Sequence, residues 1–418
     1  MEVTPRYKLT EAGDIPEVWE CAKLEKCFSF ISYGFTNPMP TVQHGVPMVT
    51  AADINEGRIH VETARRTTEV AYRMLLSAKS KPKKNDILLT KDGSLGRLAL
   101  VGDEQICINQ SVAVIRPNEK VEPIFLKLLL ESPRYQRKML EDAGGSTIKH
   151  IYITIVNLMY IGLPPNRGEQ RAIAAALCDV DALLLGLDRL IAKKRDLKQA
   201  AMQQLLTGQT RLPGFHGEWE VKPLRKLAEI VSGGTPKTTD PTYWNGGIKW
   251  CTPTDITGCT GKYLRETERT ISRLGLHSSG ARLLPAGTLL LCSRATIGEV
   301  RIASGEICTN QGFKSLVCTE EVSNEFLYNK LLTLKQEMLE RAFGSTFLEI
   351  SKGNLAAIEV NTPLFPEQTA IAAVLSDMDT ELSALEARRD KTRNLKRAMM
   401  QELLTGKTRL VPTGDSYA

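Results

Sequence analysis

Residues 169–212 read EQRAIAAALCDVDALLLGLDRLIAKKRDLKQAAMQQLLTGQTRL, and residues 367–410 read EQTAIAAVLSDMDTELSALEARRDKTRNLKRAMMQELLTGKTRL. The two stretches align without a gap at an offset of 198 residues, and 25 of their 44 positions are identical. Chance does not produce such similarity. The chain is therefore built from a duplicated unit with a period too long for a solenoid.

Both stretches are predicted to be long helices. From Ile173 to Ile191, apolar residues recur at a spacing of three and four, which places them on one stripe. Prolines precede each stretch, and Gly208 and Gly406 stand where a glycine caps a helix C-terminus. A narrow apolar stripe must pack against another apolar surface, and the stripe that matches it lies on the other copy. Because the chain leaves one variable segment along the first helix and returns along the second, we expect an antiparallel, coiled-coil-like pair.

The segments ahead of the helices also correspond, although more weakly. DILLTKDGSLGRLALV at 86–101 resembles GTLLLCSRATIGEVRIA at 287–303, and ICINQ at 106–110 resembles ICTNQ at 307–311. Trp19 and Trp219 also match and are predicted to be core anchors. Strand-like runs followed by amphipathic helical patterns indicate α+β domains.

The predicted fold class is α+β, with two pseudo-symmetric α+β domains separated by a long antiparallel coiled-coil helix pair. We expect the first variable domain at residues 1–163 and the second at 209–362. The first helix is expected at 164–208, the second at 363–407, and a C-terminal tail at 408–418.

Composition narrows the class of protein. The 418 residues carry 54 Lys and Arg against 48 Asp and Glu, a net charge of +6 that is compatible with a polyanionic partner without requiring one. Nine cysteines without a CxxC pair and five scattered histidines predict reduced thiols and no metal site. No signal peptide and no apolar run of about 18 residues is visible, so a soluble, cytoplasmic protein is expected.

Catalytic motifs are missing from the sequence. The Gly-Lys-Thr at 406–408 lacks the upstream glycine of a phosphate-binding loop, and it follows a helix rather than a strand. No amino-methyltransferase motif, metalloprotease helix, nucleophile elbow or nuclease motif is found. We therefore expect no catalytic centre and no cofactor in this chain.

The order of variable domain, helix, variable domain and helix resembles the specificity subunit of Type I restriction–modification systems. The resemblance rests on PPNRGEQRAIAAALCDVDALL and LLTGQTRL in the first copy, and on PLFPEQTAIAAVLSDMDTEL and LLTGKTRL in the second. In the second variable domain, GEWEVKPLRKLAEIVSGGTP and IKWCTPTDITG also fit. The likeness covers essentially the whole chain, but the first variable domain has FISYGFTNPMP where the second has VSGGTP.

The resemblance implies that each variable domain is a target-recognition domain for one half of an asymmetric bipartite sequence in double-stranded DNA. It implies that the helix pair sets the spacer and docks two methyltransferase subunits. S-adenosylmethionine would bind to those partners, and ATP and Mg²⁺ to two restriction subunits that can join them. Two alternatives stay open: a specificity subunit of a simpler methyltransferase or restriction enzyme, and a nucleic-acid-free two-domain scaffold.

Candidate DNA contacts are polar residues on loops at matching places in the two domains, because base edges are read by exposed donors and acceptors. In the first domain they are Thr50, Asp53, Lys91, Ser94, Asn109 and Gln110. In the second they are Thr252, Thr254, Asp255, Ser293, Arg294, Thr296, Asn310 and Gln311. A third loop pair, Gly145-Ser146-Thr147 with Gly344-Ser345-Thr346, is identical in both halves. Sameness favours a structural role for that pair and for the Asn-Gln pair.

Candidate partner contacts are acidic and amide residues repeated outside the apolar stripe, since two equivalent subunits would use the same residues twice. They are Glu169, Gln170, Asp179 and Asp181 in the first helix, and Glu367, Gln368, Asp377 and Asp379 in the second. Capping explains the two glutamates equally well, because acids stabilise the first turn of a helix.

Overall fold

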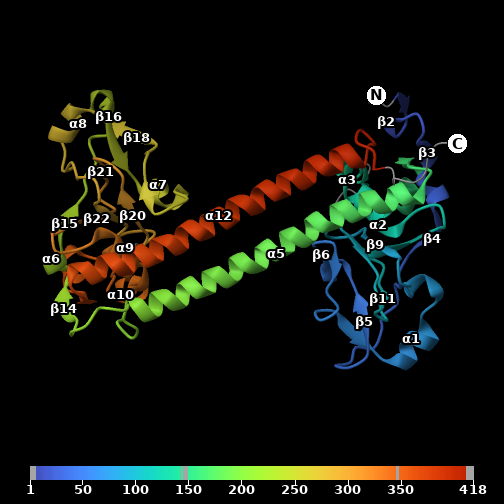
Figure 1. The fold of residues 1–418 in the computed structure, drawn as a ribbon, viewed down its shortest axis with the longest axis horizontal. Coiled ribbons are helices and arrows are strands. Elements are labelled where there is room, and N and C mark those ends of the chain that lie inside the picture. The colour runs from blue at the N-terminus through green and yellow to red at the C-terminus, as the bar shows by residue number, and fades with distance from the viewer. Residues whose placement is uncertain (1–5, 142, 145–148, 345–347, 411–418) are drawn as a thin grey trace. The chain divides into compact units, whose positions relative to one another are not determined.

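The computed structural model describes residues 6–141, 143–144, 149–344 and 348–410 (Figure 1). The loop candidates Gly145-Ser146-Thr147 and Ser345-Thr346 lie outside these ranges. The chain divides into two compact units. Unit 1 is Met1–Asp188 with Ala387–Ala418, and unit 2 is Arg189–Glu386.

Two long helices, each of 39 residues, belong partly to unit 1 and partly to unit 2. They are α5 (Arg167–Leu205) and α12 (Phe365–Leu403), drawn in green and red in Figure 1. Ion pairs that join them include Asp181–Lys396 and Asp188–Arg389 in unit 1, and Lys194–Glu381 and Lys198–Asp379 in unit 2. In both sets the numbers rise along α5 as they fall along α12. The helices therefore run antiparallel within each unit, as the sequence predicts.

The ends of the two helices are embedded in the cores of the units. In unit 1, Ile173 and Leu177 of α5 and Leu403 of α12 belong to the main apolar cluster of the domain. In unit 2, Ile371 and Leu375 of α12 share a smaller cluster with the end of α5. Each helix thus buries apolar surface against its domain as well as against the other helix, which fixes its direction as it leaves the domain.

Unit 1 contains two main sheets. The larger has the order β10-β9-β12-β4, and the smaller has the order β11-β5-β8. The strands are β1 (Tyr7–Thr10), β2 (Gly13–Pro16), β3 (Glu20–Lys23), β4 (Phe28–Tyr33), β5 (Val46–Val49), β6 (Ile54–Asn55), β7 (Arg58–Ile59), β8 (Arg65–Thr67), β9 (Ile87–Thr90), β10 (Leu98–Leu100), β11 (Cys107–Ile108), β12 (Val112–Pro117) and β13 (Tyr160–Leu163). The helices before α5 are η1 (Leu24–Cys27), η2 (Ala51–Asp53), α1 (Glu69–Leu75), η3 (Ala78–Ser80), α2 (Pro123–Glu131), α3 (Pro133–Glu141) and α4 (Ile153–Leu158).

Unit 2 repeats this plan. Its sheets have the orders β15-β22-β19-β20-β17 and β18-β16-β21. The strands are β14 (Glu220–Pro223), β15 (Ala228–Ser232), β16 (Trp244–Cys251), β17 (Tyr263–Leu264), β18 (Arg269–Ile271), β19 (Leu289–Leu291), β20 (Val300–Ala303), β21 (Cys308–Thr309), β22 (Lys314–Cys318) and β23 (Glu359–Thr362). The helices before α12 are α6 (Leu224–Leu227), η4 (Pro241–Tyr243), α7 (Pro253–Gly258), α8 (Arg273–His277), α9 (Asn324–Thr333), α10 (Lys335–Glu340) and α11 (Lys352–Ala356). The predicted α+β fold class is confirmed.

Equivalent contacts hold the C-terminal end of each long helix against the domain of the unit in which that helix ends. Trp19 is buried, and a Cβ built on Gly406 would lie 3.1 Å from its ring. In unit 2 a Cβ built on Gly208 would lie 3.3 Å from the ring of Trp219. Both glycines have φ near +75°, a conformation that glycine adopts without strain at the end of a helix. The two tryptophans pack as the sequence predicts, although Trp219 is only half-buried.

The described residues contain no helix long and apolar enough to cross a bilayer.

Candidate nucleic-acid interface

In unit 1, three loops predicted to contact DNA meet at one place. The amide of Ala51 donates to the hydroxyl of Ser111 at 3.0 Å, and the amide of Lys91 donates to the Ser111 carbonyl at 2.9 Å. The amide of Asn109 donates to the carbonyl of Val49 at 3.2 Å. Strand pairing thus brings together loops that are far apart in the sequence, at the ends of β5, β9 and β11.

The equivalent loops meet in unit 2. The amide of Ser293 donates to the carbonyl of Gly312 at 2.8 Å, and the amide of Asn310 donates to the carbonyl of Cys251 at 3.0 Å. The loop that begins at Thr252 follows Cys251 directly. The two domains therefore present the same three-loop arrangement, which we call the loop cluster of each unit.

Asp53 holds the backbone of the loop cluster in unit 1. One carboxylate oxygen accepts hydrogen bonds from the amide and hydroxyl of Thr50 at 2.9 and 2.8 Å, forming a capping box for η2. The other oxygen accepts from the hydroxyl of Thr63 at 3.1 Å. Asp53 is only 7% exposed. Because both carboxylate oxygens of Asp53 accept hydrogen bonds within the protein and the side chain is buried, Asp53 has a structural role. Its side chain is poorly placed to contact a DNA base.

Asp255 repeats this role at the start of α7. It accepts from the amide and hydroxyl of Thr252, both at 2.7 Å, and from the amide of Glu268 at 2.8 Å. The hydroxyl groups of Thr50 and Thr252 each donate their one hydrogen to the aspartate of their capping box, so neither has a hydrogen left to donate to DNA. Thr254, in contrast, is exposed. Of the residues in this loop, Thr254 is therefore the better placed for DNA contact.

The two asparagines also stabilise their own turns. Asn109 accepts from the amide and hydroxyl of Ser111 at 3.1 and 2.6 Å, and Asn310 accepts from the amide of Gly312 at 2.9 Å. Ser293 is fully buried and donates to the Gly312 carbonyl at 3.1 Å. These contacts agree with the structural alternative for the asparagines, and burial removes Ser293 from any DNA-facing surface.

The remaining uncharged candidates differ in their exposure. Gln110 and Gln311 are both exposed, and Gln311 accepts a hydrogen bond from the hydroxyl of Thr235. Ser94 is half-buried. The hydroxyl of Thr296 is buried and has no hydrogen-bond partner among the described residues. Together with Thr254, the two glutamines are thus the uncharged candidates that are exposed in the loop clusters.

Charged side chains complete the loop cluster of unit 1. Asp92 lies between Lys91, at 2.8 Å, and His150, at 2.5 Å. Burial acts to raise the pKa of Asp92, but the hydrogen bonds from these two neighbours outweigh it and hold the pKa below its usual value. The ammonium groups of Lys91 and Lys79 lie 5.6 and 5.4 Å from the ring centre of Tyr33, which is exposed. This surface suits an anion-rich partner.

Unit 2 has a corresponding charged group. Glu349 lies between Arg294, at 2.7 Å, and Lys314, at 3.2 Å. Burial acts to raise the pKa of Glu349, but hydrogen bonds from Arg294 and Lys314 lower it below its usual value. Arg294 therefore lies at the surface with its guanidinium held by a charged carboxylate.

Sequence reasoning missed three residues of the loop clusters: His150, Glu349 and Tyr33. His150 and Glu349 follow the two Gly-Ser-Thr stretches at the same distance, so aligning the repeats a few residues further would have paired them. Nothing local marks Tyr33, because its lysine neighbours come from other loops.

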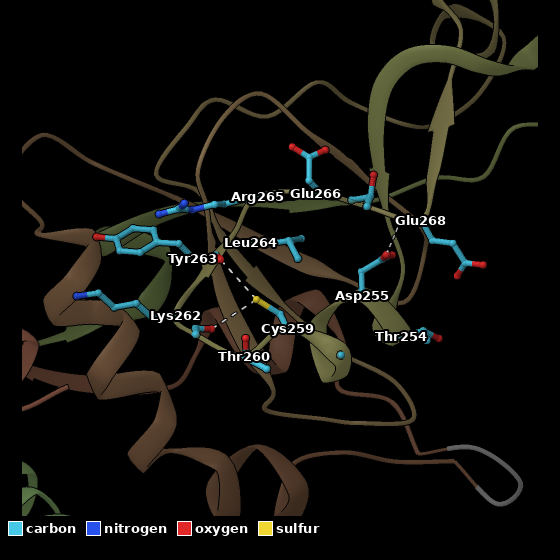
Figure 2. Close-up of a pocket in the computed structure, with 13 residues that line it drawn as sticks. Thr254, Asp255, Cys259, Thr260, Lys262, Tyr263, Leu264, Arg265, Glu266 and Glu268 are labelled. Atoms are coloured by element: carbon cyan, nitrogen blue, oxygen red, sulfur yellow. Dashed lines mark hydrogen bonds between the residues drawn. The ribbon is translucent and has the colours of Figure 1, made fainter. Parts of the chain in front are cut away.

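A hollow of about 710 Å³ lies beside the loop cluster of unit 2. Figure 2 shows Thr254 and Asp255 at one side of it and Lys262, Tyr263 and Arg265 at the other. Acidic and basic side chains are mixed in its lining, so its charge does not favour an anionic ligand. The described residues contain no cluster of three or more His, Cys, Asp or Glu arranged to hold a metal ion.

Glu169 and Glu367 were predicted to bind partner subunits, but the structure buries them at 1% and 3% exposure. Glu169 pairs with Arg409, with one oxygen–nitrogen distance of 2.7 Å, and Glu367 pairs with Arg211 at 2.6 Å. Both pairs join the start of one helix to the segment that follows the other. Their repetition is explained by this internal ion pair, and a buried carboxylate is not available for docking.

Gln170 and Gln368 are buried in the same way. Gln170 accepts from the amide of Glu122 at 2.8 Å and donates to the carbonyl of Pro164 at 2.8 Å. Gln368 does the same with the amide of Ser323 and the carbonyl of Pro363, both at 2.9 Å. Each glutamine fastens the start of a long helix to the domain that precedes it. Because both side-chain amides are buried, they are not available for docking either.

The four aspartates lie nearer the surface. Asp181 and Asp379 are half-buried and form ion pairs with lysines of the other helix. Asp179 and Asp377 are exposed and stand at equivalent positions on α5 and α12. Of the predicted partner contacts, Asp179 and Asp377 are therefore the two that the structure presents openly.

Comparison with known proteins gives a family match over most of the chain. The model of the Type I restriction modification DNA specificity domain matches twice, at residues 10–193 and 216–392. Each match takes in one variable segment and most of the helix after it.

Individual proteins agree with this match. The Type I restriction enzyme MjaIX specificity subunit of Methanocaldococcus jannaschii is 37% identical over 164 residues, which are 39% of this chain and 38% of that protein. A putative Type I restriction enzyme MjaX specificity subunit of the same organism is 24% identical over 97% of both chains. The solved S subunit of the Type I restriction–modification system of M. genitalium is 18% identical, with a TM-score of 0.58 over 96% of this chain and 99% of that one, and it supports the fold alone.

Proposed function

The chain belongs to the Type I restriction modification DNA specificity family, whose members are non-catalytic DNA-recognition subunits, and from this premise we propose how it selects its target. Each variable domain reads one half of a bipartite sequence in double-stranded DNA. The loop clusters differ in their exposed side chains, so the two half-sites differ and the target is asymmetric.

One observation carries this proposal. In each unit, three loops from the ends of paired strands are held together by equivalent backbone hydrogen bonds, while the charged side chains on them differ between the units. A shared framework with unlike side chains is what two readers of different sequences require, because base edges are distinguished by their donors and acceptors.

We propose that α5 and α12 set the length of the spacer between the half-sites. Each helix has 39 residues, about 58 Å at 1.5 Å per residue, and half-sites on one face of DNA lie about 34 Å apart. A helix pair of this length that crosses the DNA obliquely can serve both domains.

We also propose that two methyltransferase subunits dock on the helices, with Asp179 and Asp377 at equivalent places in the two contacts. Those subunits would supply S-adenosylmethionine, and two restriction subunits would supply ATP and Mg²⁺ chemistry. A DNA-recognition subunit acts where the chromosome is, so we place the protein in the cytoplasm.

Lengthening the helices tests the spacer. Seven residues of helix-forming sequence are inserted after Asp188 in α5 and after Glu386 in α12, at the boundary of the two units, so that the ion pairs within each unit keep their partners. Because seven residues add about 10 Å, we expect the spacer to grow by up to about three base pairs while both half-sites stay the same.

The measurement is single-molecule methylation sequencing of a host that expresses the variant with its methyltransferase. Insertion into α5 alone is the control, since it moves the antiparallel contacts out of register and should abolish methylation. A methylated target with an unchanged spacer would refute the helical ruler. If the complex shows no salt-dependent binding to DNA, the scaffold alternative replaces the whole proposal.

A further inference from the structure

The charged groups of the two loop clusters occupy the same backbone position but have opposite polarity. In unit 1, Asp92 on the loop after β9 forms an isolated β-bridge with His150, and their side chains lie 2.5 Å apart. In unit 2, Arg294 on the loop after β19 forms the same kind of bridge with Glu349, at 2.7 Å. The acid lies on the loop in unit 1 and on the returning segment in unit 2.

Backbone contacts show that these positions are equivalent. The amide of Ile151 donates to the Lys91 carbonyl at 3.0 Å, and the amide of Ile350 donates to the Ser293 carbonyl at 3.1 Å. The following loop residues, Gly93 and Ala295, both have positive φ. The duplicated fold therefore keeps the backbone of this site and exchanges the charges on it.

Each acid lies between two basic side chains, of which one is more exposed. In unit 2, the side chain of Arg294 is 44% exposed and that of Lys314 only 9%. In unit 1, the side chain of His150 is 38% exposed and that of Lys91 only 18%. The more exposed basic side chain thus comes from the loop in unit 2 and from the returning segment in unit 1.

The geometry leaves hydrogen-bonding atoms of Arg294 and His150 for a ligand. Glu349 contacts Nε of Arg294, and an arginine reads guanine through its two terminal nitrogens. Asp92 contacts Nδ1 of His150, and Nε2 lies on the opposite side of the ring. A fixed carboxylate beside each of these side chains is unfavourable for a phosphate, but it holds the planar side chain in one orientation for a base edge.

We infer that Arg294 and His150 each read a base in their half-site, and that Glu349 and Asp92 are positioning residues for them. This inference rests on the proposed function and assigns the base readers within it. It commits Arg294 to a guanine, for which the arginine fork is the commonest specific partner. His150 replaces Lys91 as the leading basic residue proposed to read a base in unit 1.

The test is methylation sequencing of a host that expresses the specificity chain with its methyltransferase. Arg294→Ala should relax selection at one guanine of the second half-site by about 5- to 100-fold, while the first half-site stays unchanged. Arg294→Lys keeps the charge but lacks the fork, so it should fail to restore the preference. His150→Ala should relax one position of the first half-site only.

Glu349→Gln separates positioning from packing. It should weaken selection for the same guanine without lowering affinity for DNA that lacks the target, whereas a merely structural role would reduce methylation of all sequences alike. Arg341→Ala is the matched control, because the side chain of Arg341 is 41% exposed and pairs at 2.6 Å with Glu337 of α10, the helix that Arg341 follows. It should alter neither half-site.

The outcomes separate the two proposals. If Arg294→Ala weakens methylation equally on every sequence, Arg294 is a phosphate contact and the inference is overturned. If Arg294→Lys keeps the full guanine preference, the arginine fork is not what selects the guanine and the inference is overturned as well. If the unaltered protein methylates no bipartite sequence, the proposed function fails first. For every substitution in unit 2, continued selection of the first half-site shows that the chain is still folded.

Discussion

The two units differ in their loop clusters but agree closely where the long helices begin. At the helix starts, the same residues make the same contacts: Gln170 and Gln368 accept a backbone amide and donate to a proline carbonyl at almost equal distances. At the loop clusters, the backbone is kept and the charge is inverted between Asp92 and Arg294. Duplication preserved what joins domain to helix and changed what faces outward.

A second difference concerns how each domain is fastened along its helix. In unit 2, Glu325 of α9 accepts from Lys262 at 2.7 Å and from Ser376 of α12 at 2.7 Å. In unit 1, the residues at the matching positions are Ile124, which is exposed, and Cys178. Unit 2 therefore has a polar link between its domain and its helix that these residues cannot form in unit 1.

The largest effect is expected from removing the buried amides. Gln170→Leu leaves the Glu122 amide and the carbonyls of Lys120 and Pro164 without their partner, and Gln368→Leu has the same consequence in unit 2. We expect each substitution to lower the free energy of unfolding by about 3 kcal/mol, because a buried backbone group left unpaired costs about 1–3 kcal/mol. Unit-resolved hydrogen exchange during urea unfolding measures both costs.

The controls are Asp179→Asn and Asp377→Asn, on exposed positions of the same helices, which should stay within about 0.5 kcal/mol of the unaltered chain. If Gln170→Leu and Gln368→Leu differ by more than about 1.5 kcal/mol, the two helix starts are not energetically equivalent. The comparison would then hold for geometry alone.

The sequence predicts the framework well because the framework depends on local patterns. The three- and four-residue spacing from Ile173 to Ile191 and the glycine at 208 identify α5, and duplication carries the same result to α12. The antiparallel direction follows from connectivity. These features need no knowledge of which strand pairs with which.

The site is harder to predict because its contacts are not local. Asp53 looked like a base reader, although the Thr-x-x-Asp spacing from Thr50 already allowed a capping box. Glu169 looked like a docking residue because its partner, Arg409, stands at the far end of the chain. The sequence does not predict His150 as a site residue, because only backbone pairing places it beside Asp92. Repetition reveals that a residue matters, but not which neighbour it meets.

A smaller effect is expected from the polar link of unit 2, and it depends on pH. Burial acts to raise the pKa of Glu325, but hydrogen bonds from Lys262, Tyr263 and Ser376 lower it below its usual value. A lowered carboxylate pKa stabilises the folded state above the ordinary pKa of about 4.3, and this contribution disappears as the pH falls through the folded pKa. Glu325→Gln should cost about 1 kcal/mol at pH 7 and progressively less below pH 4.

Acid unfolding curves of the two proteins provide the measurement. Tryptophan emission mainly reports unit 2, which holds Trp219, Trp244 and Trp250, while unit 1 holds Trp19 alone. Ile124→Gln at the matching position of unit 1 is the control and should leave the pH dependence as it is. Parallel acid curves for Glu325→Gln and the unaltered chain would remove this difference between the units.

The smallest effect is expected for the two ion pairs between the helices. Asp181–Lys396 and Asp379–Lys198 are related by the duplication offset, since 181 and 198 become 379 and 396 on adding 198. Their side chains keep contact with water, with the aspartates 42% and 35% exposed. Double-mutant cycles with alanine should give a coupling of about 0.5 kcal/mol for each pair, falling as salt is added.

The size of that coupling decides what the repeated aspartates are for. A coupling above about 2 kcal/mol in both pairs would mean that helix pairing alone accounts for their presence in both copies. A coupling near 0.5 kcal/mol is too weak to account for it, and the aspartates at 181 and 379 would then join Asp179 and Asp377 as candidates for contact with a partner subunit. Charge-neutral Asp→Asn variants at all four positions, assayed for methyltransferase binding against the unaltered chain, would separate these explanations, because loss of binding without loss of stability can come only from the docking surface.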